Sequence, residues 1–227
     1  MNIFNQLSYK FKHLTKLQLI LILYLPIHFI WYFILEQVNV TGYYLVHSPL
    51  DDLIPFCEWF VFAYLVWFLY MAITALYFLA KDERAFERLL LTLWTGFILS
   101  MIFISIFPTG QELRPDTMPR DNIATWIVSL IYSMDTNTNV FPSMHVVGAL
   151  AVATNIIQSQ VFRKKPWIQI GSAVLCLLII AATVFLKQHS ILDVFGGIVF
   201  YTVAHIIVHF VFKALHKGDA ESIAKPR

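Results

Sequence analysis

Residues 166–186 read PWIQIGSAVLCLLIIAATVFL, a stretch without a charged side chain. A helix of about 20 apolar residues spans the hydrocarbon core of a bilayer, so this stretch predicts a membrane span. The whole chain has the same character, because 59% of its 227 residues are hydrophobic and 13% are charged. Soluble domains carry nearer to about 25% charged residues. We therefore expect an integral membrane protein that forms a single membrane domain over residues 1–227.

Five further apolar stretches have a similar length. We expect an all-α, polytopic bundle of six transmembrane helices, at about 17–36, 57–79, 89–107, 142–162, 166–186 and 189–212. The segment Val38–Pro55 between the first two spans contains Gly42 and two prolines, which indicates a partly embedded loop. A polar loop from Pro108 to Asn122 precedes a short apolar helix, about Ile123–Met134, which we expect at the membrane interface or packed on the bundle.

Basic residues are concentrated on one of the two sides that six spans define. The far side contains only Arg114, Arg120 and Lys187, and all other Lys and Arg residues lie near the termini or in the 81–88 and 163–165 connections. By the positive-inside rule, both termini are cytoplasmic. We expect a multi-pass protein of the plasma membrane. The formal net charge of +2 gives no reason to expect a nucleic-acid partner, and protein partners are not predicted.

Two short polar motifs stand where apolar stretches begin on the non-cytoplasmic side. Pro142-Ser143-Met144-His145 opens the fourth span, and His189-Ser190-Ile191-Leu192-Asp193 opens the sixth. A titratable side chain at the mouth of a membrane span is costly to desolvate, which makes it a candidate functional residue. Because both spans begin on the same side, the two motifs can meet at one membrane face.

The residue types in these motifs are those of acid–base or nucleophilic chemistry. His189 and Asp193 are four residues apart at a helix start, so Asp193 can hold one ring nitrogen and leave the other as a nucleophile or base. His145, from another helix, can act as a general acid toward a leaving oxygen. Pro142 suits a first helical turn.

The same region offers groups that favour an anion. Ser143 and the adjacent backbone amides form a helix N-terminus, which attracts negative charge. Arg114 can neutralise phosphate oxygens, and Arg120 and Lys187 are weaker candidates for this role. Two histidines and an aspartate can also ligate a metal ion, but the arginines and the helix start favour an anion, so no metal or other cofactor is predicted.

The remaining membrane histidines have simpler explanations. His28, His205 and His209 show no partner at a helical spacing, and we interpret them as packed or hydrogen-bonded structural residues. Asp51 and Asp52 can bind a headgroup or cap the next helix, and capping is the favoured interpretation.

The order and spacing of the motifs resemble those of the type 2 phosphatidic acid phosphatase superfamily over about residues 57–212. Its first motif appears as Leu113-Arg114-Pro115, its second as Pro142-Ser143-Met144-His145 and its third as His189-Ser190-Ile191-Leu192-Asp193. The resemblance implies a catalytic core at about 89–212 and a metal-independent enzyme of phospholipid metabolism. Its substrate would be a phosphomonoester or pyrophosphate on an outer-leaflet lipid.

The resemblance also implies residue roles. His189 would attack phosphorus and form a phosphohistidine, Asp193 would orient it, and His145 would protonate the departing group. The phosphoryl oxygens would be held by Arg114 and by Ser143 with its neighbour Met144, and Lys187 or Arg120 would be further contacts.

Three positions depart from the family pattern. Phe107 stands where the first motif has lysine, Thr183 stands where the third has arginine, and Met144 replaces a glycine. The third motif without its arginine is similar to that of sphingomyelin and inositol phosphorylceramide synthases. One alternative is therefore a phosphotransferase that moves a phospho-headgroup between lipids, and another is a non-catalytic protein that binds or transports an anionic lipid.

Overall fold

The computed structural model describes residues 3–39 and 41–216 of the chain. Its helices are α1 (Ile3–Lys12), α2 (Lys16–Val38), α3 (Pro49–Leu53), α4 (Val61–Lys81), α5 (Glu83–Ile106), α6 (Ile123–Met134), α7 (Met144–Gln158), α8 (Pro166–Phe185) and α9 (Ile191–Leu215). A 3-10 turn, η1 (Glu58–Phe60), precedes α4, and two short strands are β1 (Tyr44–Leu45) and β2 (Thr109–Gly110). Apart from this pair of strands, the regular structure of residues 3–39 and 41–216 is helical.

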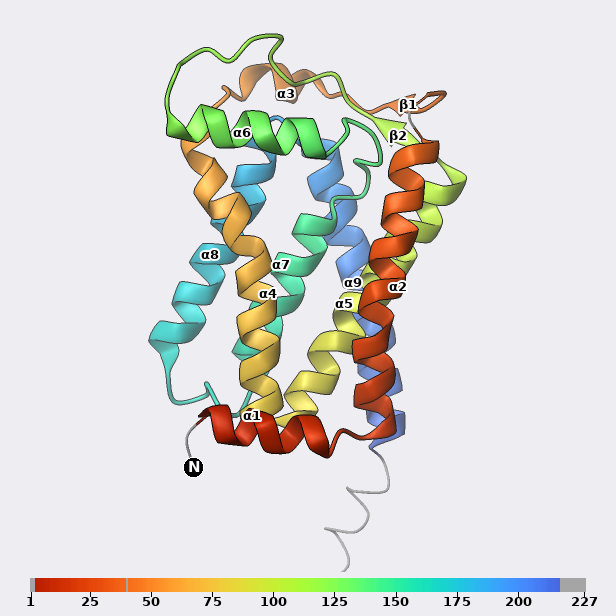
Figure 1. Cartoon of the computed structure of the whole chain (residues 1–227), viewed down its shortest axis with the longest axis vertical. Coiled ribbons are helices and arrows are strands. Elements are labelled where there is room, and N and C mark those ends of the chain that lie inside the picture. Colours follow the sequence, from red (N-terminus) through yellow and green to blue (C-terminus); the bar gives the residue numbers. More distant parts are fainter. Residues whose placement is uncertain (1–2, 40, 217–227) are drawn as a thin grey trace, which may run out of the picture.

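The long helices run side by side between two ends of a bundle (Figure 1). Helix α7 lies at the centre and packs against α4, α5, α8 and α9, whereas α2 packs on α5. Helix α1 lies across one end, where α9 also finishes, and α3 and α6 lie across the other end (Figure 1). The described ends of the chain are therefore at the same end of the bundle.

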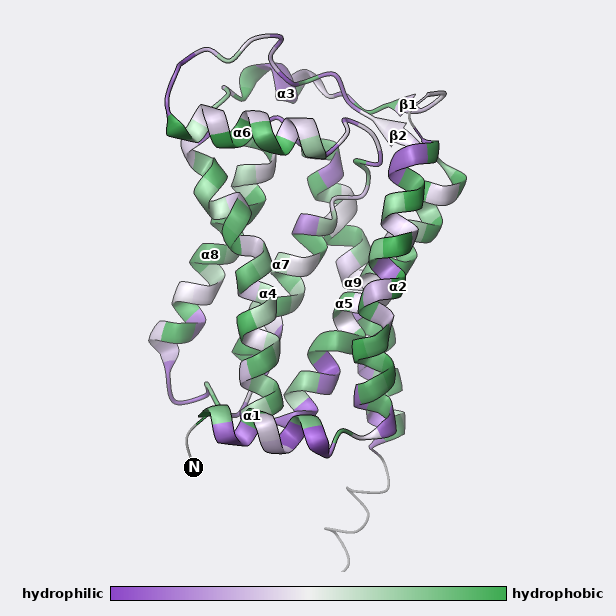
Figure 2. Ribbon diagram, viewed as in Figure 1, coloured by the Kyte–Doolittle hydropathy of each residue, from purple (hydrophilic) through white to green (hydrophobic). Residues whose placement is uncertain are grey.

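Among the described residues, five helical segments are long and apolar enough to cross a membrane: α2, η1 with α4, α5, α8 and α9. Their middle parts are hydrophobic, and the polar residues gather toward the two ends of the bundle (Figure 2). Helix α7 has 15 residues and extends about 22 Å, less than the roughly 30 Å core of a bilayer. Its apolar residues are buried against neighbouring helices, and the helix is too short to count as a span on length. A sixth span at 142–162 therefore stays a prediction.

Helix α5 begins at Glu83, earlier than the expected start at residue 89, because partners stabilise the charged residues in its first turns. The Gln18 amide donates to Glu83 Oε2 at 3.1 Å and to Glu87 Oε1 at 3.0 Å, and Lys10 pairs with Glu83. Helix α1 supplies Lys10 and was not predicted from the sequence. The short helix expected at 123–134 has the bounds of α6, and Asn122 caps its first turn.

The segment between α2 and α4 is ordered by contacts to distant loops. Strand β1 pairs with β2 in parallel, which ties the segment to the loop after α5. The Asp51 carboxylate accepts the Ser48 N–H at 2.8 Å in the capping box of α3, the short helix that contains it, and does not cap the next helix as was expected. It also accepts hydrogen bonds from Ser190 Oγ at 2.6 Å and from the Ile191 N–H at 2.8 Å. Asp51 therefore holds the turn that begins α9.

Candidate active site

A cavity of about 420 Å³ lies at the end of the bundle that α6 covers. Its walls come from α2, α4, α5, α6, α7, the connection between α6 and α7 and the turn between α8 and α9. The polar lining residues include His28, Tyr32, Tyr64, Asp135, Thr136, Thr138, Asn139, His145, Gln188 and His189. The cavity thus brings together both histidines of the sequence motifs, which are 44 positions apart in the chain.

The imidazoles of His145 and His189 lie side by side, with ring centroids 5.8 Å apart. His189 Nδ1 is 3.2 Å from Asp193 Oδ2, and the Asp193 side chain is fully buried. With the carboxylate ionised, this contact assigns the proton to Nδ1 and leaves Nε2 with a free lone pair. The two side chains therefore form the oriented histidine that nucleophilic or base chemistry requires.

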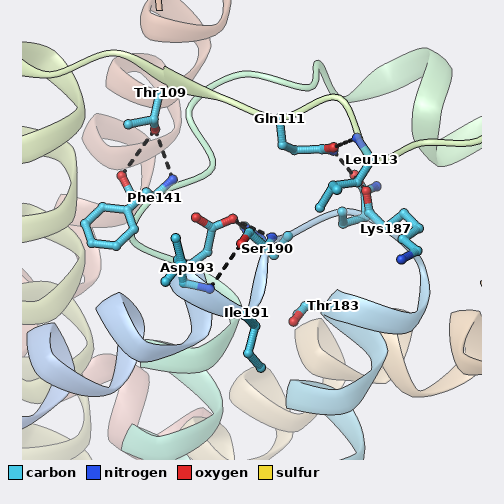
Figure 3. Close-up of polar contacts among 12 residues, drawn as sticks. Thr109, Gln111, Leu113, Phe141, Thr183, Lys187, Ser190, Ile191 and Asp193 are labelled. Carbon is cyan, nitrogen blue, oxygen red and sulfur yellow. Dashed lines mark hydrogen bonds and ion pairs between the residues drawn. The ribbon is translucent and has the colours of Figure 1, made fainter. Parts of the chain in front are cut away.

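A helix cap fixes the position of Asp193. Ser190 is the N-cap of α9, and its backbone N–H donates to Asp193 Oδ2 at 2.9 Å, as Figure 3 shows. His189 itself lies just before the helix, and its N–H donates to the carbonyl of Thr183 at the end of α8 at 3.1 Å. The end of α8 and the start of α9 thus hold the histidine between them.

His145 lies in the first turn of α7. Its ring packs on Tyr64 and Trp67 of α4, with both pairs of centroids 4.3 Å apart. Pro142 is not in the helical turn where it was expected, because α7 begins at Met144 and Ser143 is its N-cap. The Ser143 N–H donates to the Asp193 carbonyl at 3.1 Å, and this bond joins the second motif directly to the third.

Several buried polar atoms in this region have no hydrogen-bond partner among the described residues. They are Trp67 Nε1, Ser143 Oγ, His145 Nε2, Gln188 Nε2 and Asp193 Oδ1. Buried polar groups in folded proteins are almost always paired, and an unpaired one calls for an explanation such as a ligand or an ordered water. Three of these residues, Trp67, His145 and Gln188, line the cavity, which indicates a site for a polar, multiply hydrogen-bonding group.

Arg114 lies one layer behind the cavity wall. Its guanidinium donates to the backbone carbonyls of Tyr132, Asp135 and Thr136 and to Gln188 Oε1 at 2.6 Å. Three of these bonds go to the residues that end α6 or follow it, so Arg114 fixes that helix over the cavity. Arg114 itself does not line the cavity, and it contacts the lining residue Gln188 through this side-chain bond.

The other two predicted basic contacts lie elsewhere. The Lys187 ammonium donates to the Asp51 carbonyl at 2.7 Å, and its side chain extends away from Asp193 (Figure 3). Burial lowers the pKa of Lys187, although Asp51 and Asp52 oppose the shift. Arg120 forms a two-point ion pair with the buried Glu58, with N–O distances of 2.5 and 2.6 Å. Neither residue lines the cavity.

The structure adds site residues that the sequence did not indicate. Asp135 lines the cavity and accepts a hydrogen bond from the Tyr32 hydroxyl at 2.9 Å. Burial, together with the nearby Glu36 carboxylate, raises the pKa of Asp135. Gln188 and Tyr64 also line the cavity. None of these residues belongs to a recognisable motif. The only sequence signal for Gln188 was its position directly before His189.

The described residues contain no group of three or more His, Cys, Asp or Glu side chains placed to hold a metal ion. The metal triad considered for His145, His189 and Asp193 is therefore not seen as a ligand cluster. What the cavity does offer is a pair of histidines, one of them bound to a carboxylate, with unpaired donors around them.

Replacing Asp51 by alanine is expected to lower both stability and activity. The change leaves the Ser48 N–H, the Ser190 hydroxyl and the Ile191 N–H without their acceptor, and an unsatisfied buried donor costs about 1–3 kcal/mol. We expect a lower Tm and about a tenfold lower kcat/KM, because the turn that bears His189 loses its support. Thermal unfolding and steady-state turnover measure the two effects.

The neighbouring residue provides a matched control for this prediction. Asp52 has an exposed side chain whose contact is with His47, so Asp52→Ala is expected to change neither Tm nor turnover appreciably. Equal effects of the two substitutions would contradict the supporting role of Asp51.

The fold and the cavity together define an integral membrane protein with a paired-histidine site at one end of a helical bundle. A model of the PAP2 superfamily matches residues 89–216, which is more than half of the chain. The chain therefore belongs to the PAP2 superfamily, whose members are phosphatases or phosphotransferases that act on lipids. Comparisons with curated proteins and with solved structures gave no significant match.

Proposed function

We propose that this protein is a membrane lipid phosphatase that removes a phosphate or pyrophosphate group through a covalent intermediate on His189. The observation that carries the proposal is the pairing of His189 with Asp193 beside His145 in one cavity. Candidate substrates are phosphatidate, a phosphatidylglycerol phosphate or a polyprenyl pyrophosphate. The coarse chemistry, group transfer from a lipid phosphate, is that of the superfamily.

In the first step, His189 Nε2 attacks phosphorus and the bond from phosphorus to the lipid oxygen breaks. The Asp193 carboxylate keeps the Nδ1 proton in place and stabilises the positive charge that develops on the ring. His145 gives a proton to the departing oxygen, so the lipid leaves as an alcohol. With a phosphomonoester, the products of this step are the free lipid alcohol, a phosphohistidine at position 189 and a neutral His145. With a pyrophosphate, His189 attacks the terminal phosphorus, the bond to the bridging oxygen breaks, and the lipid monophosphate leaves in place of the alcohol.

The phosphoryl oxygens need donors during this step, and the unpaired atoms around the cavity can supply them. We assign this role to Ser143 Oγ, to the first backbone amides of α7 at Met144 and His145, and to Gln188 Nε2. This is supported by the unpaired state of the two side-chain atoms and by the position of Ser143 as the N-cap of α7. Helix N-terminal amides lack intrahelical partners and favour negative charge. Arg114 adds its charge from behind Gln188.

In the second step, water attacks the phosphohistidine. His145 accepts the proton that the water loses, the nitrogen–phosphorus bond breaks, and inorganic phosphate leaves. His145 is thereby protonated for the next cycle, and His189 regains its lone pair. No metal ion takes part in this scheme, so turnover in the presence of a chelator is expected to equal turnover without it.

The active site is proposed to face the non-cytoplasmic side of the plasma membrane. The cavity lies at the end of the bundle that carries Arg114, Arg120 and Lys187, whereas the more basic end carries α1 and the end of α9. The positive-inside rule places the more basic end in the cytoplasm. Accessibility of a cysteine introduced in the 115–120 loop to an impermeant reagent in intact cells tests this orientation.

A phosphohistidine is expected to form on the purified protein during turnover. Rapid acid-free quenching after addition of phosphate-labelled phosphatidate, followed by peptide mass spectrometry, should place the label on the peptide that contains His189. The bond should be labile to acid and stable to base, as a nitrogen–phosphorus bond is. Label found on another residue would contradict covalent catalysis at this position. So would turnover of labelled p-nitrophenyl phosphate by a His145→Gln variant without a trapped intermediate, because this leaving group needs no proton and only the hydrolysis step is then slowed.

A second candidate function is transfer of a phospho-headgroup from one lipid to another. The observation that favours it is the environment of Thr183, which stands where the family motif has arginine. The Thr183 carbonyl accepts the N–H groups of Gln188 and His189 at 3.0 and 3.1 Å, so an arginine here would add its charge close to the site. Without that arginine, the site suits the single negative charge of a phosphodiester better than the nearly two negative charges of a phosphomonoester at pH 7.

The acceptor distinguishes the two functions. With a headgroup-labelled phospholipid and a panel of lipid alcohols, a transferase moves the label to a second lipid, whereas a phosphatase releases free phosphate from a phosphomonoester. Neither product, with lipid binding retained, would favour the non-catalytic lipid-binding alternative.

A further inference from the structure

His28 is a buried histidine within the apolar part of α2 that the proposed chemistry does not use. Its side chain is 7% exposed, and it lines the same cavity as His145 and His189. Its ring stacks on Phe97 of α5, with centroids 5.1 Å apart and planes inclined by 19°. The interpretation from sequence was a packed structural residue, yet His28 shares the cavity with the proposed catalytic pair.

No hydrogen bond reaches either ring nitrogen of His28 from the residues that the structure describes. Nδ1 is buried and unpaired, whereas His205, another membrane histidine, has the Tyr201 hydroxyl 3.4 Å from its Nδ1. An unpaired polar group at membrane depth is destabilising, and intramembrane histidines normally serve a ligand or a partner. The absence of a protein partner points to a ligand group in the cavity.

The depth of His28 relative to the catalytic pair limits what that ligand group can be. Tyr32, one turn further along α2, binds Asp135 at the polar end of the cavity. His28 therefore lies about 6 Å deeper along the helix axis than Tyr32. The cavity wall around it is apolar and includes Phe29, Leu65 and Phe68.

The cavity also reaches the lipid-facing surface between α2 and α4. These helices each pack on α5 and make few contacts with one another. Phe29 on α2 and Leu65 and Phe68 on α4 line the cavity and are also 54%, 39% and 49% exposed. A lipid with its phosphate at the histidine pair can therefore extend its chains past His28 toward the bilayer.

We propose that His28 hydrogen-bonds a carbonyl in the backbone of the substrate lipid, and that the substrate is a glycerolipid or sphingolipid rather than a polyprenyl phosphate. The ring N–H donates to an ester or amide carbonyl a few bonds below the phosphate. A polyprenyl chain has no polar group at that depth and would leave the imidazole unpaired. This inference rests on the proposed function, because it assumes the phosphate lies at His145 and His189.

The test compares two lipids that differ only in this carbonyl. Diacyl phosphatidate and its dialkyl ether analogue, with equal chain lengths, are offered to the wild-type protein and to His28→Phe, with polyprenyl phosphate as a third substrate. We expect the wild type to prefer the diacyl lipid about tenfold in kcat/KM, which is about 1.4 kcal/mol. In His28→Phe the ratio is expected to fall to about one, and polyprenyl phosphate is expected to be the poorest wild-type substrate.

Two further variants keep the test interpretable. His28→Gln retains a donor and is expected to keep most of the preference, which also covers the case that the phenylalanine variant misfolds. His205→Phe changes a membrane histidine outside the cavity and is expected to leave the ratio unchanged. Equal wild-type turnover of the two phosphatidates, a preference that survives in His28→Phe, or efficient turnover of polyprenyl phosphate would overturn the proposal.

Failure of this inference can be distinguished from failure of the proposed function. Binding of the same two phosphatidates to the His189→Ala protein can be measured without turnover, as the rise in Tm that each lipid causes. Equal stabilisation by both lipids counts against His28, and stronger stabilisation by the diacyl lipid supports it. Persistent turnover by His189→Ala counts against the nucleophile alone.

Discussion

Replacing His189 by alanine is expected to lower kcat by at least about 10³-fold, the scale on which loss of a nucleophile acts in covalent catalysis. The imidazole is the group whose Nε2 bonds to phosphorus, and no described neighbour can take over that position while Asp193 holds Nδ1. The effect should appear in kcat, with little change in the affinity for substrate lipid. The loss of kcat is measured as the rate of phosphate release from phosphatidate in detergent micelles, with a chelator present.

Two controls separate this result from misfolding. His205→Ala replaces a histidine of α9 that lies outside the cavity, and it is expected to retain wild-type turnover. The Tm of His189→Ala should remain close to that of the wild type, because the histidine packs at the edge of a cavity. Activity within tenfold of the wild type in a well-folded His189→Ala protein would rule out the nucleophile.

Replacing His145 by alanine is expected to lower kcat for a lipid substrate by about 10²–10⁴-fold, the usual contribution of general acid–base catalysis. The ring is held by Tyr64 and Trp67 with Nε2 unpaired and near His189, which suits transfer of a proton to the leaving oxygen. A lipid alkoxide is a poor leaving group, so loss of the proton donor should affect its departure strongly.

The leaving group provides the sharper measurement for His145. With p-nitrophenyl phosphate the departing phenolate needs no proton, so the first step should be far less sensitive to His145→Ala than with phosphatidate. If His145 is a general acid, His145→Ala should therefore lower the single-turnover rate much less with the aryl ester than with phosphatidate. Equal losses with both substrates would show that His145 acts through packing or binding instead.

The lengths and polarity of the apolar stretches were enough to predict a membrane-embedded helical protein. Helix α6 and most of the long helices lie close to their predicted positions, because about 20 uncharged residues leave few alternatives to a helix in a bilayer. The central helix α7 was harder to predict, because a buried helix and a lipid-facing helix are equally apolar in sequence. Its 15 residues differ in length from the expected 142–162 span.

The histidine motifs were recognisable because acid–base groups at the mouth of apolar stretches are rare, and because Asp193 follows His189 at helical spacing. The basic residues were less predictable. Arg120 and Lys187 lie in the correct loops, yet Glu58 and the Asp51 carbonyl hold their side chains away from the cavity. A sequence shows which charges are present, but the partners of each charge depend on contacts between distant loops.

By itself, the sequence determined that this is a helical membrane protein, and it predicted that two histidines and an aspartate meet at one end of the bundle, because hydrophobic length and helical spacing are local properties. Only the tertiary structure decided which polar groups share the cavity. His28 enters it from α2, and Asp135 and Gln188 enter it from two different connections, whereas Asp51 supports it from α3, far away in the chain. Such contacts form when the bundle packs, and no local pattern of residues encodes them.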